Sequence, residues 1–400
     1  MNPFKGFRGA VGLTALLLGA TALAGGALAA TANENPNGHS LCVTETPFGT
    51  MPDGKRVEMF HLKNAGGMEV DIITYGGRVQ SIKVPDKNGK IEDVALGFDD
   101  LQGYLSKDDP YFGALIGRYG NRIAKGEFAL DGKTYHLPIN NGPNSLHRGT
   151  MGFDKKVWAA SPIETPDAVG VELSLWSPDG DMGFPGNLAV TARYTLDNNN
   201  DLRIHYSAVT DKPTVINLTN HTYFNLAGAG NGTVLDQVAM INANRITPID
   251  STLIPTGKMM DVAATDLGFT TPTLIGAHIR ADNQQLKYAE PKQGGYDFNY
   301  VLNDPGDLNA LAASVTDPKS GRTIEMYTDE PGVQFYTSNF LNDVRGKDGK
   351  VYPHWGAFTL EAQHFPDSPN QPNFPSTELK PGEKYSQTTI YKFLPTNVPS

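Results

Sequence analysis

The sequence predicts an all-β protein built as a large antiparallel β-sandwich. Its 400 residues include 43 glycines and 28 prolines, and only 19% are charged, so the chain can bury a large core and still place many residues in turns. Short runs in which apolar and polar residues alternate recur between these glycines and prolines. No window longer than about twelve residues keeps a helical periodicity with capping signals at both ends.

Two segments show the strand alternation clearly. In residues 171–175 and 202–208 every second side chain is apolar, the pattern of a strand with one buried face. Residues 197–201 are all Asp or Asn and predict a hairpin turn before the second segment. Because we find no linker and no repeat after about residue 57, residues 30–400 are expected to form one domain, strand-rich from roughly residue 35 to 398. Further strands are expected at residues 70–74, 188–196, 322–327, 333–337, 357–361 and 387–393.

The first 29 residues are predicted to be a signal peptide. Lys5 and Arg8 form a basic start, residues 10–23 are mostly apolar, and Ala27-Leu28-Ala29 supplies the small residues of a cleavage site before Ala30. An uncleaved anchor is the alternative, but the apolar run is short for a span of about 20 residues and contains Gly and Thr. A periplasmic or secreted mature protein is therefore expected.

Charge and cysteine content narrow the expected partners. Acidic residues outnumber basic ones 43 to 33, and no run of Lys or Arg could neutralise phosphates. Nucleic acid is therefore excluded as a partner, and so is a membrane once the signal peptide is removed. Cys42 is the only cysteine, so no disulfide within the chain is expected, and we interpret it as a structural or incidental thiol.

Candidate functional residues occur in dense polar segments. Residues 217–226 place His221 among three asparagines and two threonines, directly after an apolar pair. A hydrogen-bonded core histidine is the simpler interpretation, but several amides and hydroxyls in one stretch suit a site that contacts a sugar. Residues 359–370 follow an apolar run and present Glu361, which alone could be a solvated carboxylate at a strand end.

Four further segments carry polar side chains in glycine-rich or turn-like surroundings. Residues 117–123 contain Asn121 and Arg122, and residues 144–149 place His147 at a turn. Asp297 lies two residues after a pair of glycines, and Gln334 lies in an expected strand. Taken singly, an arginine here would be a surface or ion-paired residue and Gln334 an ordinary strand residue.

Taken in their order along the chain, the segments resemble the aldose 1-epimerase (galactose mutarotase) family. The motifs that carry the resemblance are residues 117–123, 144–149, 220–226, 295–297, 331–337 and 360–370, and residues 96–99 and 181–187 add to it. The resemblance implies a β-sandwich with a sugar cleft across one face. It implies that His221 is the general acid and Glu361 the general base. The residues that it implies hold the sugar are Asn121, Arg122, His147, Asp297 and Gln334. Where many members have Gly-Gly after the first histidine, this chain has Arg148-Gly149.

The implied reaction interconverts the α and β anomers of a free aldose such as galactose or glucose. Opening a pyranose requires a base at the anomeric hydroxyl and an acid at the ring oxygen, roles that a carboxylate and a histidine suit. The chain has no His-Glu-x-x-His pair, no cysteine cluster and no glycine-rich nucleotide loop after a strand. We therefore expect no metal and no cofactor, an aldose sugar as the only small-molecule partner, and either a monomer or a homodimer.

Three other functions are compatible with parts of the sequence. A non-catalytic carbohydrate-binding protein would share the polar ligands without needing an acid beside a base. A hexose-6-phosphate 1-epimerase would need additional basic residues for the phosphate, in a chain that is acidic and carries an export signal. A glycoside hydrolase or lyase would need a second carboxylate near Glu361, for which Asp297 is the only candidate.

Overall fold

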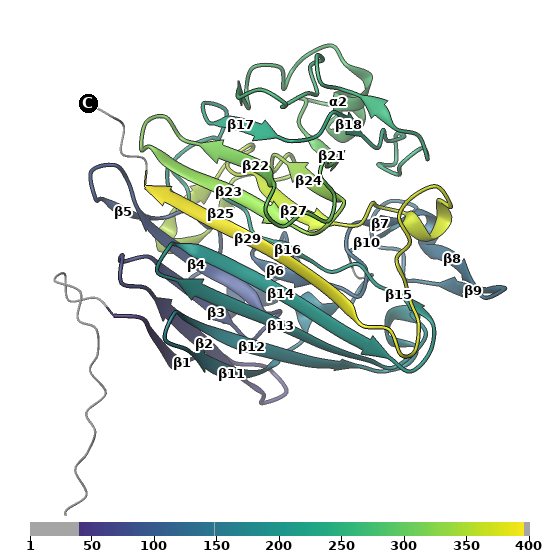
Figure 1. The fold of residues 1–400 in the computed structure, drawn as a ribbon, viewed down its shortest axis with the longest axis horizontal. Helices are drawn as coiled ribbons and strands as arrows, with labels where there is room; N and C mark the ends of the chain where they lie inside the picture. Colours follow the sequence, from purple (N-terminus) through teal and green to yellow (C-terminus); the bar gives the residue numbers. More distant parts are fainter. Residues whose placement is uncertain (1–39, 148, 396–400) are drawn as a thin grey trace, which may run out of the picture. The chain divides into compact units, whose positions relative to one another are not determined.

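Nine antiparallel strands form the largest sheet of the computed structural model, which describes residues 40–147 and 149–395 (Figure 1). The predicted signal peptide and Arg148 lie outside the described residues. The strand order is β11-β12-β13-β14-β29-β23-β22-β17-β20. The bounds are β11 (Ala159–Glu164), β12 (Ala168–Ser177), β13 (Leu188–Asp197), β14 (Asp201–Thr210), β29 (Tyr385–Pro395), β23 (Arg322–Thr328), β22 (Leu311–Thr316), β17 (Val238–Ile241) and β20 (Thr273–Leu274).

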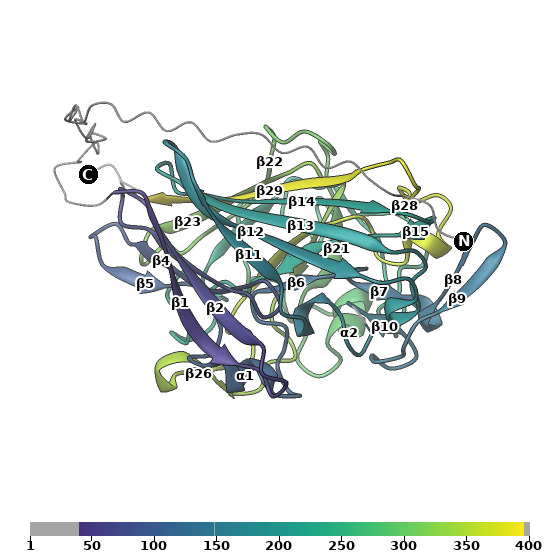
Figure 2. The same cartoon turned by 90° about the horizontal axis from the view of Figure 1, so that it is seen from below.

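Two five-stranded antiparallel sheets pack on one face of the large sheet. The first follows chain order and the second has the order β19-β18-β21-β24-β27. Phe60 of the first, Phe335 of the second and Ile204 of the large sheet belong to one buried apolar cluster, so the three sheets share a core. In Figure 2, β1 and β2 lie beside β11 and β12; β1 contacts both of these strands and β2 contacts β12. The bounds are β1 (Cys42–Thr50), β2 (Arg56–Lys63), β3 (Glu69–Ile73), β4 (Arg78–Pro85), β5 (Ile91–Asp93), β19 (Met260–Asp261), β18 (Arg245–Ile246), β21 (Asp297–Val301), β24 (Gly332–Tyr336) and β27 (Thr359–Gln363).

Short pairs of strands and a few helical turns complete the described chain. The two α-helices have five and six residues, and no helix of the described part is long and apolar enough to cross a membrane. The paired strands are β6 (Ala114–Ile116) with β16 (Thr219–His221), β7 (Arg122–Ile123) with β10 (Ser145–Leu146), β8 (Glu127–Leu130) with β9 (Lys133–His136), β15 (Thr214–Val215) with β28 (Glu378–Leu379), and β25 (Val344–Arg345) with β26 (Val351–Tyr352). The helices are α1 (Leu101–Leu105) and α2 (Gln284–Ala289), and the 3₁₀ turns are η1 (Ala124–Gly126), η2 (Phe153–Lys155), η3 (Asp181–Gly183), η4 (Lys347–Gly349) and η5 (Ser368–Asn370).

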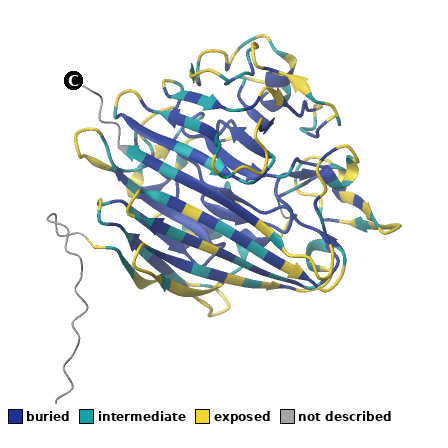
Figure 3. Cartoon of the chain, viewed as in Figure 1, coloured by how far each residue is buried: buried dark blue, intermediate teal, exposed yellow. Residues whose placement is uncertain are grey.

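The predicted fold class and all eight predicted strands are confirmed. Along β12 and β14 buried residues alternate with more exposed ones, and Figure 3 shows this alternation as bands across the sheet. The β13–β14 hairpin turns at the Asp/Asn run, where the Asp197 carboxylate accepts from the backbone N–H groups of Asn199 and Asp201. β27 begins two residues later than expected, because Phe358 pairs instead with Phe224 in an isolated bridge.

Candidate active site

The floor of the cavity that contains the candidate residues is one face of β21, β24 and β27. Residues alternate between the two faces of a strand, and Phe298, Phe335 and Leu360 from these strands belong to the shared core. The alternate positions include Asp297 and Glu361, which line a cavity of about 140 Å³. That volume holds roughly ten water-sized positions, enough for a small organic molecule.

All seven residues singled out from the sequence line this cavity. They are Asn121, Arg122, His147, His221, Asp297, Gln334 and Glu361. Sequence reasoning did not single out the remaining lining residues, which are Pro110, Tyr111, Leu146, Tyr223, Tyr336, Phe340 and Leu341. Tyr223 and Tyr336 lie within motifs that carry the family resemblance, whereas no local sequence pattern marks Tyr111 or Phe340.

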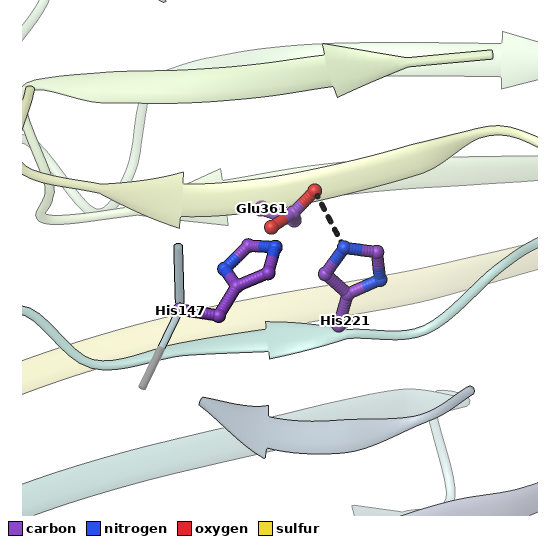
Figure 4. A group of neighbouring side chains, drawn as sticks. All are labelled: His147, His221 and Glu361. Atoms are coloured by element: carbon purple, nitrogen blue, oxygen red, sulfur yellow. Dashed lines mark ion pairs between the residues drawn. The ribbon is translucent and has the colours of Figure 1, made fainter. Parts of the chain in front are cut away.

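His221 and Glu361 face each other across the cavity. His221 ends β16, Glu361 lies at the middle of β27, and His221 Nε2 is 3.5 Å from Glu361 Oε1 (Figure 4). Both side chains are nearly inaccessible, yet His221 Nδ1 and Glu361 Oε2 have no hydrogen-bond partner within the described residues. Buried polar atoms are rarely left unpaired, so these two atoms mark a place where a polar ligand would be stabilised.

Burial opposes charge on both members of this pair. It lowers the pKa of His221 to about 3, and the positive charge of Arg78 acts in the same direction. It raises the pKa of Glu361 to about 8, although the Thr359 hydroxyl donates to Glu361 Oε1 at 2.8 Å and opposes the rise. Between these two pKa values the pair holds a single proton. In the free site this proton lies on Glu361, because burial favours the neutral form of both residues.

His147 is fixed by the backbone of Asn121. The backbone N–H of Asn121 donates to His147 Nδ1 at 3.1 Å, and the backbone N–H of His147 donates to the Asn121 carbonyl at 2.8 Å. A backbone N–H can only donate, so a neutral His147 carries its proton on Nε2. Both residues have a left-handed backbone, with φ of 64° at Asn121 and 59° at His147, a conformation uncommon outside glycine. The turn thus presents a donor, Nε2–H, next to His221. The centroids of the two imidazole rings are 5.0 Å apart.

Arg122, Asp297 and Gln334 form a connected polar group along the floor. Arg122 Nη1 lies 3.8 Å from Asp297 Oδ2, and Gln334 Nε2 donates to Asp297 Oδ1 at 2.7 Å. Burial raises the pKa of Asp297, while Arg122 and Gln334 counter part of that rise. A carboxylate held between two donors suits recognition of sugar hydroxyls.

The other arginine of the same glycine-rich motif has a structural task. Arg118 is buried, and its guanidinium donates to the Ser177 hydroxyl and to four backbone carbonyls, including those of Pro185 and Gly186. Of the two arginines in residues 117–123, only Arg122 lines the cavity. Spacing alone could not separate these roles.

Two histidines and a glutamate come close enough to suggest a metal site. Potential ligand atoms of His147, His221 and Glu361 all lie within 4.8 Å of one another. A metal at His147 Nε2 would need a lone pair there, but the Asn121 N–H already uses the lone pair of Nδ1. That hydrogen bond opposes metal binding by His147 in this geometry.

The family model, the similar sequences and the similar structures all point to the same group of proteins. The sequence model of the family described as aldose 1-epimerase matches residues 58–392. Over 355 residues the chain is 45% identical to a galactose mutarotase of Rattus norvegicus, covering 88% of this chain and 99% of the relative. It is 36% identical over 354 residues to an aldose 1-epimerase of Escherichia coli, with the same coverage. The crystal structure of a galactose 1-epimerase from Lactobacillus acidophilus superposes with a TM-score of 0.77 at 29% identity, covering 89% of this chain and 99% of that one.

Proposed function

Because this chain belongs to the aldose 1-epimerase family, we propose that His221 and Glu361 open and reclose the ring of a free aldose. The enzyme is an isomerase. The observation that carries the proposal is the 3.5 Å separation of His221 Nε2 and Glu361 Oε1 at the cavity. The two oxygens on which they act, O1 and O5, are both bonded to C1, so the acid and the base must be neighbours.

In the proposed reaction Glu361 takes the proton of the anomeric hydroxyl while His221 gives a proton to the ring oxygen. The C1–O5 bond breaks as the C1–O1 bond gains double-bond character, which leaves an open-chain aldehyde. Rotation about C1–C2 presents the other face of the aldehyde to the O5 hydroxyl. Reclosure with the two proton roles reversed yields the opposite anomer and restores the starting protonation of the pair.

Sugar binding has to move the shared proton for these roles to apply. In the free site burial favours neutral His221 and protonated Glu361. A bound sugar donates its anomeric hydroxyl to Glu361 and accepts at O5 from His221, so both new hydrogen bonds favour the carboxylate and the imidazolium. The reactive charge distribution thus forms only when a sugar fills the cavity.

The substrate proposed is an unphosphorylated aldose such as galactose or glucose, with Asn121, Arg122, His147, Asp297 and Gln334 as the residues that hold it. Among the described lining residues Arg122 is the only Lys or Arg, and Asp297 faces it at 3.8 Å. A sugar phosphate would bring a second strong anion to this one arginine. This charge balance supports a neutral sugar over a hexose 6-phosphate.

Polarimetry of freshly dissolved α-galactose and α-glucose tests the proposal. Purified protein should speed the decay of optical rotation to its equilibrium value, with galactose 6-phosphate as the charged comparison. Inactivity on all free aldoses together with measurable sugar binding would instead indicate a carbohydrate-binding protein. Release of reducing ends from oligosaccharides would indicate a hydrolase.

We also propose that residues 1–29 direct export and are removed. The support is the basic start at Lys5 and Arg8, the apolar run and the Ala27-Leu28-Ala29 site. The amino terminus of the mature protein should begin at or near Ala30. As a matched pair, Ala29→Lys should block cleavage and Ala29→Ser should permit it; retention of residues 1–20 in the wild-type protein would contradict the proposal.

A further inference from the structure

Gln363 lies beside the cavity, on one of the strands that form its floor. It is two residues from Glu361 on β27, so the two side chains emerge from the same face of the strand. Gln363 is completely buried and is not among the residues that line the cavity. Its role must therefore be exerted through the residues around it.

The amide of Gln363 forms hydrogen bonds with three residues that are distant from it in sequence. Its Nε2 donates to Gln334 Oε1 at 3.0 Å and to Asn299 Oδ1 at 3.1 Å. Its Oε1 accepts from Asn121 Nδ2 at 3.3 Å. Both donor hydrogens and the acceptor are used, so the amide has one orientation that satisfies all three partners.

That orientation is passed on to the cavity. Because Gln334 Oε1 accepts from Gln363, the Gln334 amide group must turn its Nε2 toward Asp297 Oδ1, where it donates at 2.7 Å. Were the Gln334 amide reversed, its oxygen would face the carboxylate of Asp297 and repel it. Gln363 therefore determines which atoms of two cavity residues point at a ligand.

Close packing around Gln363 supports this arrangement. Gly332 lies opposite Gln363 on β24, and a Cβ at this position would come within 2.5 Å of Asn299 Oδ1. Asn299 is itself held through its Nδ2, which donates to the Thr247 hydroxyl at 3.4 Å. The glycine makes room for the hydrogen bond between Asn299 and Gln363.

We propose that Gln363 is a positioning residue for sugar binding that fixes the amides of Gln334 and Asn121 and, through Gln334, the carboxylate of Asp297. This rests on the proposed function, in which those three residues hold the sugar. Gln363 does not touch the sugar, and its loss should affect sugar binding more than the chemical step.

Gln363→Met tests the proposal, since methionine fills a similar volume without hydrogen bonds. KM for galactose should rise about tenfold, the equivalent of one to two lost hydrogen bonds, while kcat changes less than about threefold. A folded Gln363→Met protein with wild-type KM, or with a loss confined to kcat, would overturn the proposal.

Gln363→Glu gives a second readout that a merely structural role would not move. Its carboxyl can still accept from Asn121, but when ionised it faces the oxygens of Gln334 and Asn299 with no proton to donate. Burial raises the pKa of such a carboxyl, so acidification should restore one donor. KM relative to the wild type should fall severalfold between about pH 8 and about pH 5, and a constant ratio would contradict the proposal even if Gln363→Met does not fold.

Gln387 supplies the matched control. It is equally buried, on β29, and its Nε2 donates to the backbone carbonyls of Leu218 and Ala362 rather than to any cavity side chain. Gln387→Glu should lower stability without a pH-dependent change in relative KM. Gln334→Leu and Asp297→Asn distinguish a failure of the sugar-holding roles from a failure of the positioning role of Gln363. If they leave KM unchanged, the proposed sugar-holding roles are wrong; if they raise KM and Gln363→Met does not, only the positioning role is wrong.

Discussion

Two histidine–glutamate pairs lie close together in this molecule and are built in opposite ways. His364 directly follows β27, and its Nδ1 is 2.6 Å from Glu330 Oε2, a hydrogen-bonded contact. Burial lowers the pKa of His364, but the hydrogen bond and charge of Glu330 outweigh it and the pKa is raised. In the cavity, His221 and Glu361 are 3.5 Å apart, each retains an unpaired atom, and burial moves both pKa values toward the neutral forms.

The same two residue types therefore stabilise the fold in one place and form a ligand site in the other. A closed pair satisfies its own hydrogen bonds and strengthens the fold. An open pair at a buried cavity leaves polar atoms without protein partners, which lowers the stability of the free protein and raises the gain when a ligand supplies the missing partners.

The largest expected difference is in turnover. Glu361→Gln keeps the shape of the side chain and removes its basicity, so mutarotation should fall by about 10² to 10⁴, and His221→Asn should do likewise. The double variant should be little worse than the poorer single one, since the two groups act as a unit. Glu330→Gln is the matched control and should stay within about threefold of the wild type. Polarimetry measures the rates and circular dichroism checks the fold; a folded Glu361→Gln protein with near wild-type activity would remove Glu361 from the mechanism.

The same substitutions should change stability in opposite directions. The pKa of Glu361 is raised from 4.5 to about 8, so its contribution to stability is full below pH 4.5 and is lost as pH rises through about 8. At about pH 8 Glu361→Gln should therefore stabilise the protein by about 2–4 kcal/mol. Glu330→Gln should destabilise it by about 1.5–3 kcal/mol, because a hydrogen bond to a charged group is lost. Urea unfolding of both variants measures these changes, and a change of the same sign in both would show that the two pairs do not differ in their effect on stability.

The pH dependence of kcat/KM should also distinguish the two pairs. Below about pH 3 the cavity pair holds two protons and lacks a base, and above about pH 8 it holds none and lacks an acid. The rate should decline about tenfold per pH unit beyond each limit. In His364→Asn both limits should remain in place; a shift of either limit in this variant would mean that the two pairs are electrostatically coupled.

The smallest expected effect concerns metals. The hydrogen bond from the Asn121 N–H to His147 Nδ1 opposes a metal at this ring, so activity should survive exhaustive dialysis against EDTA. Loss of activity with EDTA and recovery with a divalent ion would show that His147, His221 and Glu361 bind a metal after all.

Strand periodicity predicted the long strands because their burial pattern is local. β12 and β14 each have one face in the core and one in solvent, and the alternation can be read from ten consecutive residues. β16 and β7 have three and two residues, and their pairing depends on partners about 100 and about 20 positions away. No local pattern contains that information.

The site was predictable as a set of residue types and less so as a geometry. Alternation in β27 marks Glu361 as facing away from the core, but it does not tell whether that face meets solvent or an enclosed cavity. The resemblance to a family supplied seven of the fourteen residues that line the cavity, while their proposed roles stay predictions. Gln363 lay inside a quoted motif and was not singled out, because its importance comes from hydrogen bonds to residues distant in sequence.

The position of β29 has a consequence for how the protein is made. This last strand pairs with β14 on one side and β23 on the other, and so joins the first half of the nine-stranded sheet to the second. Until residues 385–395 have left the ribosome, the two halves have no strand between them, and the sheet cannot be completed during synthesis. For a protein that we propose is exported, this order of synthesis favours translocation of a chain whose largest sheet is still incomplete.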